Sequence, residues 1–197
     1  MSSTNDSAGD IVGRAFTCYA FSEAVKRTQQ QYGTRDFCRT LEGRQPCNDI
    51  LTGPAIDFIH SSDSFLLGTA NVEGWPHVQH RGGPWGFLKV LDRNRLAFGD
   101  FDGNQQLISV GNISENPKIH LLLIDYERRR RLKVWGNASV HPPRDPLIEA
   151  LAHPAYRHRI ARIMVIDVVA WDFNCNKHIS ARPVGRANNT AQSEMQR

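Results

Sequence analysis

The chain has 197 residues, 40% of them hydrophobic and 22% charged, which is the composition of one globular domain with a sizeable core. Its formal net charge of +4 and its sequence pI of about 9.0 favour anionic ligands, but this basic excess is too small to indicate nucleic acid by itself. No apolar run approaches the ~20 residues that cross a bilayer, so we expect no membrane partner.

The cysteines show neither the paired spacing of a zinc site nor a secretory context. No two of them form a CxxC pair, and the chain starts with polar residues rather than with a basic and then apolar leader. We therefore expect reduced thiols and a cytoplasmic protein. The four cysteines are Cys18, Cys38, Cys47 and Cys175.

The first part of the chain is expected to be helical after a disordered start. Residues 1–13 are small and polar, which is typical of disorder. In residues 16–32 apolar side chains recur at helical intervals, which predicts one amphipathic helix. Residues 34–50 have little periodicity and leave a loop or a short helix open, while residues 54–60 favour a short helix. We treat residues 14–62 as an N-terminal helical segment.

Residues 63–182 show short apolar stretches separated by turn residues, the pattern of an antiparallel barrel. The expected strands are residues 64–71, 75–81, 86–91, 95–101, 119–126, 131–140 and 160–171. Helices are expected at about residues 105–112 and 146–153, and a disordered tail at residues 183–197.

A run of four arginines, Arg128 to Arg131, lies between two of these strand candidates. Basic clusters can neutralise phosphates, but a solvated hairpin turn explains this run without a ligand. The aromatic placement typical of nucleic-acid modules is missing. We therefore expect no nucleic-acid partner.

The strand candidate at residues 75–81 carries polar side chains on alternate positions. Alternation places His77, Gln79 and Arg81 on one face, and Val78 and His80 on the other. Spacing alone leaves two interpretations of Arg81 open, an ordinary surface arginine or a ligand-binding one.

Three stretches of the chain resemble the pyridoxamine 5′-phosphate oxidase-like family of flavin-binding split β-barrels. They are residues 76–81 (PHVQHR), 96–101 (LAFGDF) and 104–117 (NQQLISVGNISENP), and the resemblance covers about residues 50–182. It implies a mainly β fold with flanking helices, in which six or more antiparallel strands form the barrel. It also implies a homodimer with FMN at the subunit interface.

The resemblance implies three groups of cofactor-binding residues. The phosphate and ribityl chain would contact Arg81, Asn104, Gln105 and Ser109, and the isoalloxazine ring would contact Gln79, His80 and Gly82, with Lys89 close by. The partner subunit's flavin would be reached by Trp171, Asn174, Lys177 and His178. The residues themselves leave open that Gly82 and Gly83 form a bulge, that Trp171 is barrel core, and that His178 is a surface histidine.

The implied function is an FMN-dependent oxidoreductase acting on a small organic substrate or NAD(P)H. Vitamin B6 oxidation is doubtful, because residues 171–182 contain no Arg-Leu-x-x-Arg element like that of true pyridoxamine phosphate oxidases. The alternatives are a non-catalytic FMN-binding or flavin-sensing protein and, less favoured, haem binding through His80 or His178. Neither HExxH nor a Cys/His cluster is present, so no metal site is expected, and no catalytic residue is assigned.

Overall fold

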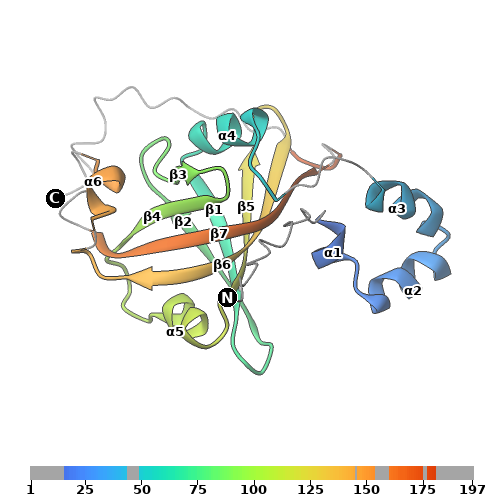
Figure 1. The fold of residues 1–197 in the computed structure, drawn as a ribbon, viewed down its shortest axis with the longest axis horizontal. Coiled ribbons are helices and arrows are strands. Elements are labelled where there is room, and N and C mark those ends of the chain that lie inside the picture. Colours follow the sequence, from blue (N-terminus) through green and yellow to red (C-terminus); the bar gives the residue numbers. More distant parts are fainter. Residues whose placement is uncertain (1–15, 44–48, 145, 154–159, 175–176, 181–197) are drawn as a thin grey trace, which may run out of the picture.

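The computed structural model describes residues 16–43, 49–144, 146–153, 160–174 and 177–180. The stretches predicted to be disordered, residues 1–13 and 183–197, lie outside these ranges. Within them, seven antiparallel strands form one curled sheet in the order β2-β1-β5-β6-β7-β4-β3 (Figure 1). The strands are β1 (Ser64–Ala70), β2 (Pro76–Gly82), β3 (Lys89–Asp92), β4 (Arg95–Phe101), β5 (Lys118–Asp125), β6 (Arg130–His141) and β7 (Ile160–Asn174).

The barrel closes because the two ends of the sheet approach each other. β2 lies at one end of the strand order and β4 near the other, yet Arg81 of β2 forms an ion pair with Asp100 of β4. Side chains rather than a backbone ladder therefore join these two strands. The predicted mainly β fold, an antiparallel split barrel with flanking helices, is confirmed.

Alternation along the strands fills the barrel with apolar side chains. On β5 the buried residues are Ile119, Leu121 and Leu123. β7 behaves differently, since its residues from Ile163 to Ile166 are all buried. A second apolar cluster explains this, because residues of β4, β7 and α6 (Ile148–Leu151) pack together beside the main core.

Six helices flank the described part of the barrel, and three of the helix predictions, those for residues 16–32, 105–112 and 146–153, are wrong in their limits, the last of them being α6 (Ile148–Leu151). Residues 16–32 form two helices, α1 (Thr17–Ala20) and α2 (Glu23–Gln31). Ser22 separates them because its extended backbone and its side chain, which accepts a hydrogen bond from the Val25 N–H at 3.3 Å, cap the second helix. The open stretch contains α3 (Arg35–Glu42), and the helix before the barrel is α4 (Gly53–His60).

The helix predicted at residues 105–112 begins three residues later, as α5 (Ile108–Glu115). Gln105 and Leu107 have φ of 59° and 55°, so the backbone before Ile108 is left-handed. Side chains disfavour this conformation, and a right-handed helix cannot pass through it. The segment directly before α5 is therefore a non-helical loop.

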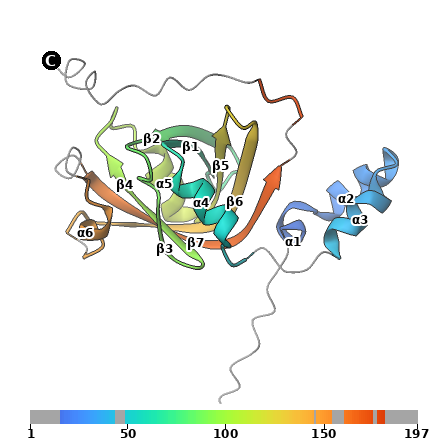
Figure 2. The same ribbon diagram turned by 90° about the horizontal axis from the view of Figure 1, so that it is seen from above.

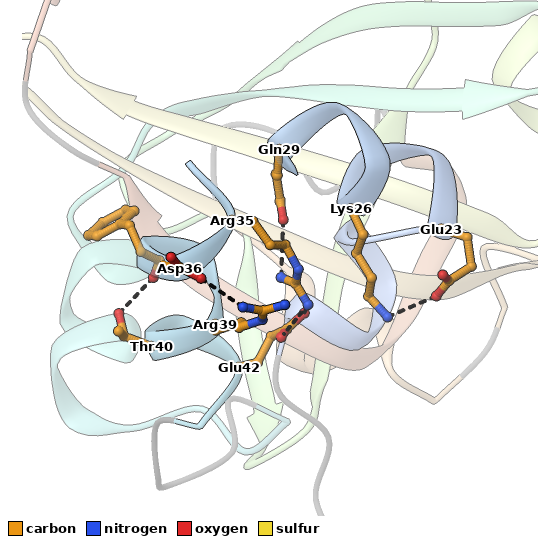
Figure 3. A network of polar contacts seen from close by, with 9 residues as sticks. Glu23, Lys26, Gln29, Arg35, Asp36, Arg39, Thr40 and Glu42 are labelled. Atoms are coloured by element: carbon orange, nitrogen blue, oxygen red, sulfur yellow. Dashed lines mark hydrogen bonds and ion pairs between the residues drawn. The ribbon is translucent and has the colours of Figure 1, made fainter. Parts of the chain in front are cut away.

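The helices α2 and α3 form an arm beside the barrel that polar contacts hold together (Figures 2 and 3). Arg35 donates to both carboxylate oxygens of Glu42 at 2.9 and 3.0 Å and to Gln29 at 3.1 Å. α3 has no buried residue, and Gln29 is the buried residue of α2. This arm thus lacks an apolar core of its own.

Phe16, just before α1, packs against the outer side of the barrel. Its ring stacks on Trp135 with the centroids 5.9 Å apart, and the Trp135 ring in turn meets His120 edge-on at 4.9 Å. Burial lowers the pKa of His120 below its ordinary 6.5, and the charge of Lys133 lowers it further. The folded protein therefore holds His120 in its neutral form more strongly than the unfolded chain does.

This histidine is expected to make the protein less stable in mild acid. Below pH 6.5 the unfolded chain binds a proton at His120 that the folded protein disfavours, so stability falls as pH falls from 6.5 towards the lower folded pKa. Urea denaturation at about pH 7.5 and about pH 5 should show that His120→Phe loses less stability on acidification than the original protein. Equal losses in both proteins would contradict this assignment.

Candidate functional site

One pocket lies where the ends of β2 and β4 meet the loop before α5 and the start of β7. It is partly open to solvent, and we call it the mouth pocket. Its lining combines charged, amide, hydroxyl and apolar groups. The lining residues are Gln79, Arg81, Asp100, Phe101, Gly103, Asn104, Gln105, Leu107, Ser109, Val110 and Arg162.

Asp100 is the centre of charge in the mouth pocket. Its side chain is 3% exposed and accepts hydrogen bonds from two arginines, Arg81 and Arg162, the second through Nε at 3.0 Å. Two guanidinium groups and one carboxylate leave a net positive charge, because arginine stays protonated in proteins. This cluster favours an anionic ligand over a neutral one.

Arg81 retains hydrogen-bonding capacity that the described chain does not use. Its Nε is buried and has no hydrogen-bond partner among the described residues. Burial lowers the pKa of this guanidinium, while Asp100 acts in the opposite direction and Arg162 adds to the lowering. A buried donor without an acceptor is costly, so an anion accepting from Arg81 would relieve that cost.

The polar contacts of α5 fix the opposite wall of the pocket. Ser109 is buried and its hydroxyl donates to Oε1 of Gln79 at 2.9 Å. Asn112 donates to the Thr69 hydroxyl at 3.0 Å, and Asn116 donates to the Ala70 carbonyl at 3.1 Å. The helix is thereby held against β1 and β2, and its positive N-terminal end faces the same pocket as the arginines.

The structure brings together five of the residues that the sequence analysis named. All four candidates for the phosphate and ribityl chain line the mouth pocket, as does one candidate for the ring. They are Gln79, Arg81, Asn104, Gln105 and Ser109. As predicted from strand alternation, Gln79 and Arg81 are half-buried on one face of β2 and His80 is exposed on the other.

Gly82 and Lys89 do not line the mouth pocket. Gly82 is the last residue of β2 and Gly83 follows it. An added Cβ at Gly83 would lie 2.7 Å from the Phe87 ring, so the glycine at this position lets Phe87 pack closely against the backbone. Lys89 lines a second pocket together with Trp85 and Phe87.

The four C-terminal candidates lie away from the mouth pocket of their own chain. Trp171 is 8% exposed and its Nε1 donates to the Ile50 carbonyl at 3.0 Å, so its indole belongs to the core. Asn174 ends β7, whereas Arg162 lies near its start, and roughly 40 Å of extended strand separates them. Lys177 and His178 follow Asn174 and are exposed.

Sequence reasoning missed Asp100 and Arg162 as site residues. Asp100 is the only acidic residue of β4 and Arg162 is the only basic residue of β7, and the two are direct cross-strand partners in the β4–β7 pairing. Buried charges need an opposite partner. The sequence therefore held one signal for this pair, namely a single acidic residue in one strand and a single basic residue in another, which predicts that the two strands are neighbours and that the two charges pair.

In residues 16–43, 49–144, 146–153, 160–174 and 177–180, no helix has the length and apolarity needed to cross a membrane. Nor does the part of the chain that the structure describes contain a group of three or more His, Cys, Asp or Glu residues able to hold a metal ion.

An antiparallel sheet that curls until side chains join its ends defines the chain as a split β-barrel protein. The family model described as pyridoxamine 5′-phosphate oxidase matches residues 52–175, which is more than half of the chain. The protein therefore belongs to the pyridoxamine 5′-phosphate oxidase family. No curated protein matches the chain.

Solved structures show the same fold at low sequence identity. HupZ from Group A Streptococcus, in a histidine-to-alanine variant, is 18% identical, with 64% of this chain and 100% of that chain covered and a TM-score of 0.51. A putative pyridoxamine 5′-phosphate oxidase from Lactobacillus delbrueckii is 20% identical, with 63% and 94% covered and a TM-score of 0.50. Similarity at this level establishes the fold and leaves the ligand to be argued from the site.

Proposed function

We propose that this protein is an FMN-dependent oxidoreductase that acts on a small organic substrate or on NAD(P)H. The observation that carries the proposal is the pair of arginines on one buried carboxylate in the mouth pocket. Guanidinium groups and a helix N-terminus are the donors that proteins use for phosphate groups. Family membership supports a flavin as the molecule that carries this phosphate.

The residues of the mouth pocket fit the phosphate and ribityl parts of FMN. Arg81 offers its buried, unpartnered Nε, and the Oδ1 of Asn104 accepts the Gln106 N–H at 3.1 Å, which leaves the Asn104 Nδ2 to donate. Gln105 and Ser109 would contact the ribityl hydroxyls. The bound isoalloxazine ring would supply the redox chemistry, and the protein would orient it in a positive environment that favours the reduced anionic form.

The C-terminal candidates take part only if two subunits meet. In their own subunit these residues lie away from the mouth pocket. Arg162 of the pocket is near the start of β7, whereas Asn174 ends this strand and Lys177 and His178 follow it. We therefore propose a homodimer in which these residues approach the partner's flavin ring, beside Gly82 and His80 of that subunit. Lys89 lines a separate pocket. It would contact the isoalloxazine ring only where the ring extends beyond the mouth pocket.

The proposal is tested by adding FMN to the purified protein, removing unbound ligand on a desalting column and recording the visible spectrum. We expect retained bands at ~450 and ~370 nm, where oxidised isoalloxazine absorbs, and loss of the ~450 nm band when NAD(P)H is added without oxygen. Retained flavin that no donor reduces would indicate a flavin-binding protein without turnover. A colourless protein, or a haem Soret band in its place, would contradict the flavin proposal.

Arg81→Met is expected to weaken FMN binding at least about tenfold, because a charge-assisted hydrogen bond to phosphate is lost. Fluorescence titration of FMN against the protein measures this change. Arg95→Met is the matched control, since Arg95 of β4 pairs with Asp92 at the surface and lies outside the mouth pocket. Equal affinity of the Arg81 variant and the control would remove Arg81 from the site.

A further inference from the structure

The arm formed by α2 and α3 carries large apolar side chains that its own subunit leaves exposed. Phe37 of α3 is 64% exposed, and Tyr32, directly after α2, is exposed as well. Figures 1 and 2 show that the arm projects beside the barrel rather than lying flat on a face of the sheet. These side chains are therefore accessible to a surface outside their own subunit.

The two helices of the arm are short for helices that bury so little. α2 has 9 residues and α3 has 8, and the buried residue in these two helices is the polar Gln29. Isolated helices below about 12–15 residues are marginal in water, and helices in proteins gain most of their stability by burying an apolar face. The contacts of Arg35 with Gln29 and Glu42 hold α2 and α3 together but supply no such burial. A second apolar surface against the arm would supply it.

The charges of the arm favour a protein surface over a membrane or a nucleic acid. Residues 23–42 contain four basic and three acidic side chains. Ion pairs inside the arm involve all three acids, namely Glu23 with Lys26, Asp36 with Arg39, and Glu42 with Arg35. Helices that lie on anionic membranes carry a strongly basic polar face, and nucleic-acid binding requires uncompensated basic groups. The nearly neutral arm has neither property.

The arm begins beside the end of β7 that the proposed homodimer brings to the partner subunit. The ring of Phe16 lies 5.1 Å from Nζ of Lys133, and Lys133 pairs with Asp172 of β7 at 3.2 Å. Asp172 is close in the strand to Asn174, which the proposed homodimer places next to β2 of the partner. In that dimer the arm of one subunit therefore lies on the side that faces β2 of the other.

The hairpin of β1 and β2 carries the matching apolar surface. Trp75 is 72% exposed, and Val72 in the turn and Val78 of β2 are also exposed. Val78 lies on the same face of β2 as His80, the residue that the proposed homodimer places near the partner's C-terminal residues. Exposed apolar groups that gather in one place mark interaction sites, whereas single ones do not.

We propose that in the homodimer the arm of each subunit packs on the β1–β2 hairpin of its partner. Tyr32 and Phe37 meet the partner's Val72, the partner's Trp75 and the partner's Val78. Twofold symmetry repeats the contact, so each subunit both extends an arm and receives one. The inference rests on the homodimer of the proposed function and is independent of the flavin.

Sedimentation velocity of the full chain measures the strength of the dimer. Phe37→Ser and Trp75→Ser should each raise the dimer dissociation constant at least about tenfold, because a large side chain leaves the interface. The double variant should show less than the product of the two effects, since both side chains belong to one contact. Trp85→Ser is the control, because Trp85 is 60% exposed and lies outside both surfaces, and it should leave the dissociation constant unchanged.

Photo-cross-linking distinguishes the partner subunit from the arm's own barrel. With p-benzoylphenylalanine in place of Phe37, irradiation should give a covalent dimer, and mass spectrometry should locate the link in residues 71–78 of the second chain. The same group in place of Trp85 should give no link to the arm. Links that stay within one chain would show that the arm folds back on its own barrel and would overturn the proposal.

Two other results would also overturn it, namely a dimer that Phe37→Ser does not weaken and an original protein that is monomeric. Binding of the original protein, but not of Phe37→Ser, to vesicles of phosphatidylcholine and phosphatidylserine would assign the arm to a membrane instead. Failure of the flavin proposal has a separate signature. A dimer that responds to these substitutions as expected, but retains no FMN after desalting, supports the arm contact and contradicts the proposed oxidoreductase.

Discussion

Replacing Asp100 with alanine is expected to lower the free energy of unfolding by about 3 kcal/mol, because two guanidinium groups lose their shared counter-charge. The side chains of Arg81 and Arg162 are 14% and 23% exposed, so water compensates them only in part. Urea denaturation of the two proteins, analysed with equal m-values, measures the difference.

A triple variant separates charge from packing in this prediction. Arg81→Met, Asp100→Leu and Arg162→Met together remove all three charges and keep most of the side-chain volume, so this protein should be more stable than Asp100→Ala alone. It should also lose FMN binding. A loss below about 1 kcal/mol for Asp100→Ala would contradict the view that the carboxylate holds the barrel ends together.

Gly136→Ala is expected to destabilise the barrel by about 2–3 kcal/mol, since no space exists for a side chain at this position. An added Cβ would lie 2.6 Å from Cγ2 of Ile166 and 2.8 Å from the backbone oxygen of Asp167. The β6–β7 register shifts between Trp135 and Gly136, so Gly136 lies at the irregularity that bends these long strands. Thermal unfolding measures the loss.

Gly111→Ala is the matched control for this substitution. Gly111 is an exposed residue of α5, and an added Cβ there has no neighbour within 4 Å. Alanine favours a helix by roughly 1 kcal/mol over glycine, so Gly111→Ala should leave the protein equally stable or more stable. If both variants unfold at the same temperature, the contacts around Gly136 do not constrain the fold.

The strands were predictable because each carries a local signal. Alternation and turn residues located the strands to within a few residues, and alternation alone placed Arg81 and Gln79 on the same face of β2. The start of α5 was not predictable in this way, because Leu107 adopts a left-handed backbone that its side chain does not favour. Ser22 could have been recognised, as it is a good N-cap residue inside an otherwise helical pattern.

The site was predictable only where neighbours in sequence are neighbours in space. Asn104, Gln105 and Ser109 share one loop and the helix that follows it, so their order along the chain was enough. The pairing of Asp100 with the two arginines was not predictable in this way, because it depends on how the strands are arranged in the barrel. Arg81 is 19 positions from Asp100 in sequence, and Arg162 is 62 positions from it. Lys89 begins β3 and lines a different pocket, so its position in the order of the chain did not place it in the mouth pocket.

The position of the phosphate in a crystal structure of the protein with bound FMN tests the central claim most directly. We predict phosphate oxygens within hydrogen-bonding distance, about 2.7–3.2 Å, of both Arg81 and Arg162. The ribityl chain should then run past Ser109. A phosphate bound elsewhere, for example beside Lys89 in the second pocket, would contradict the account of the mouth pocket.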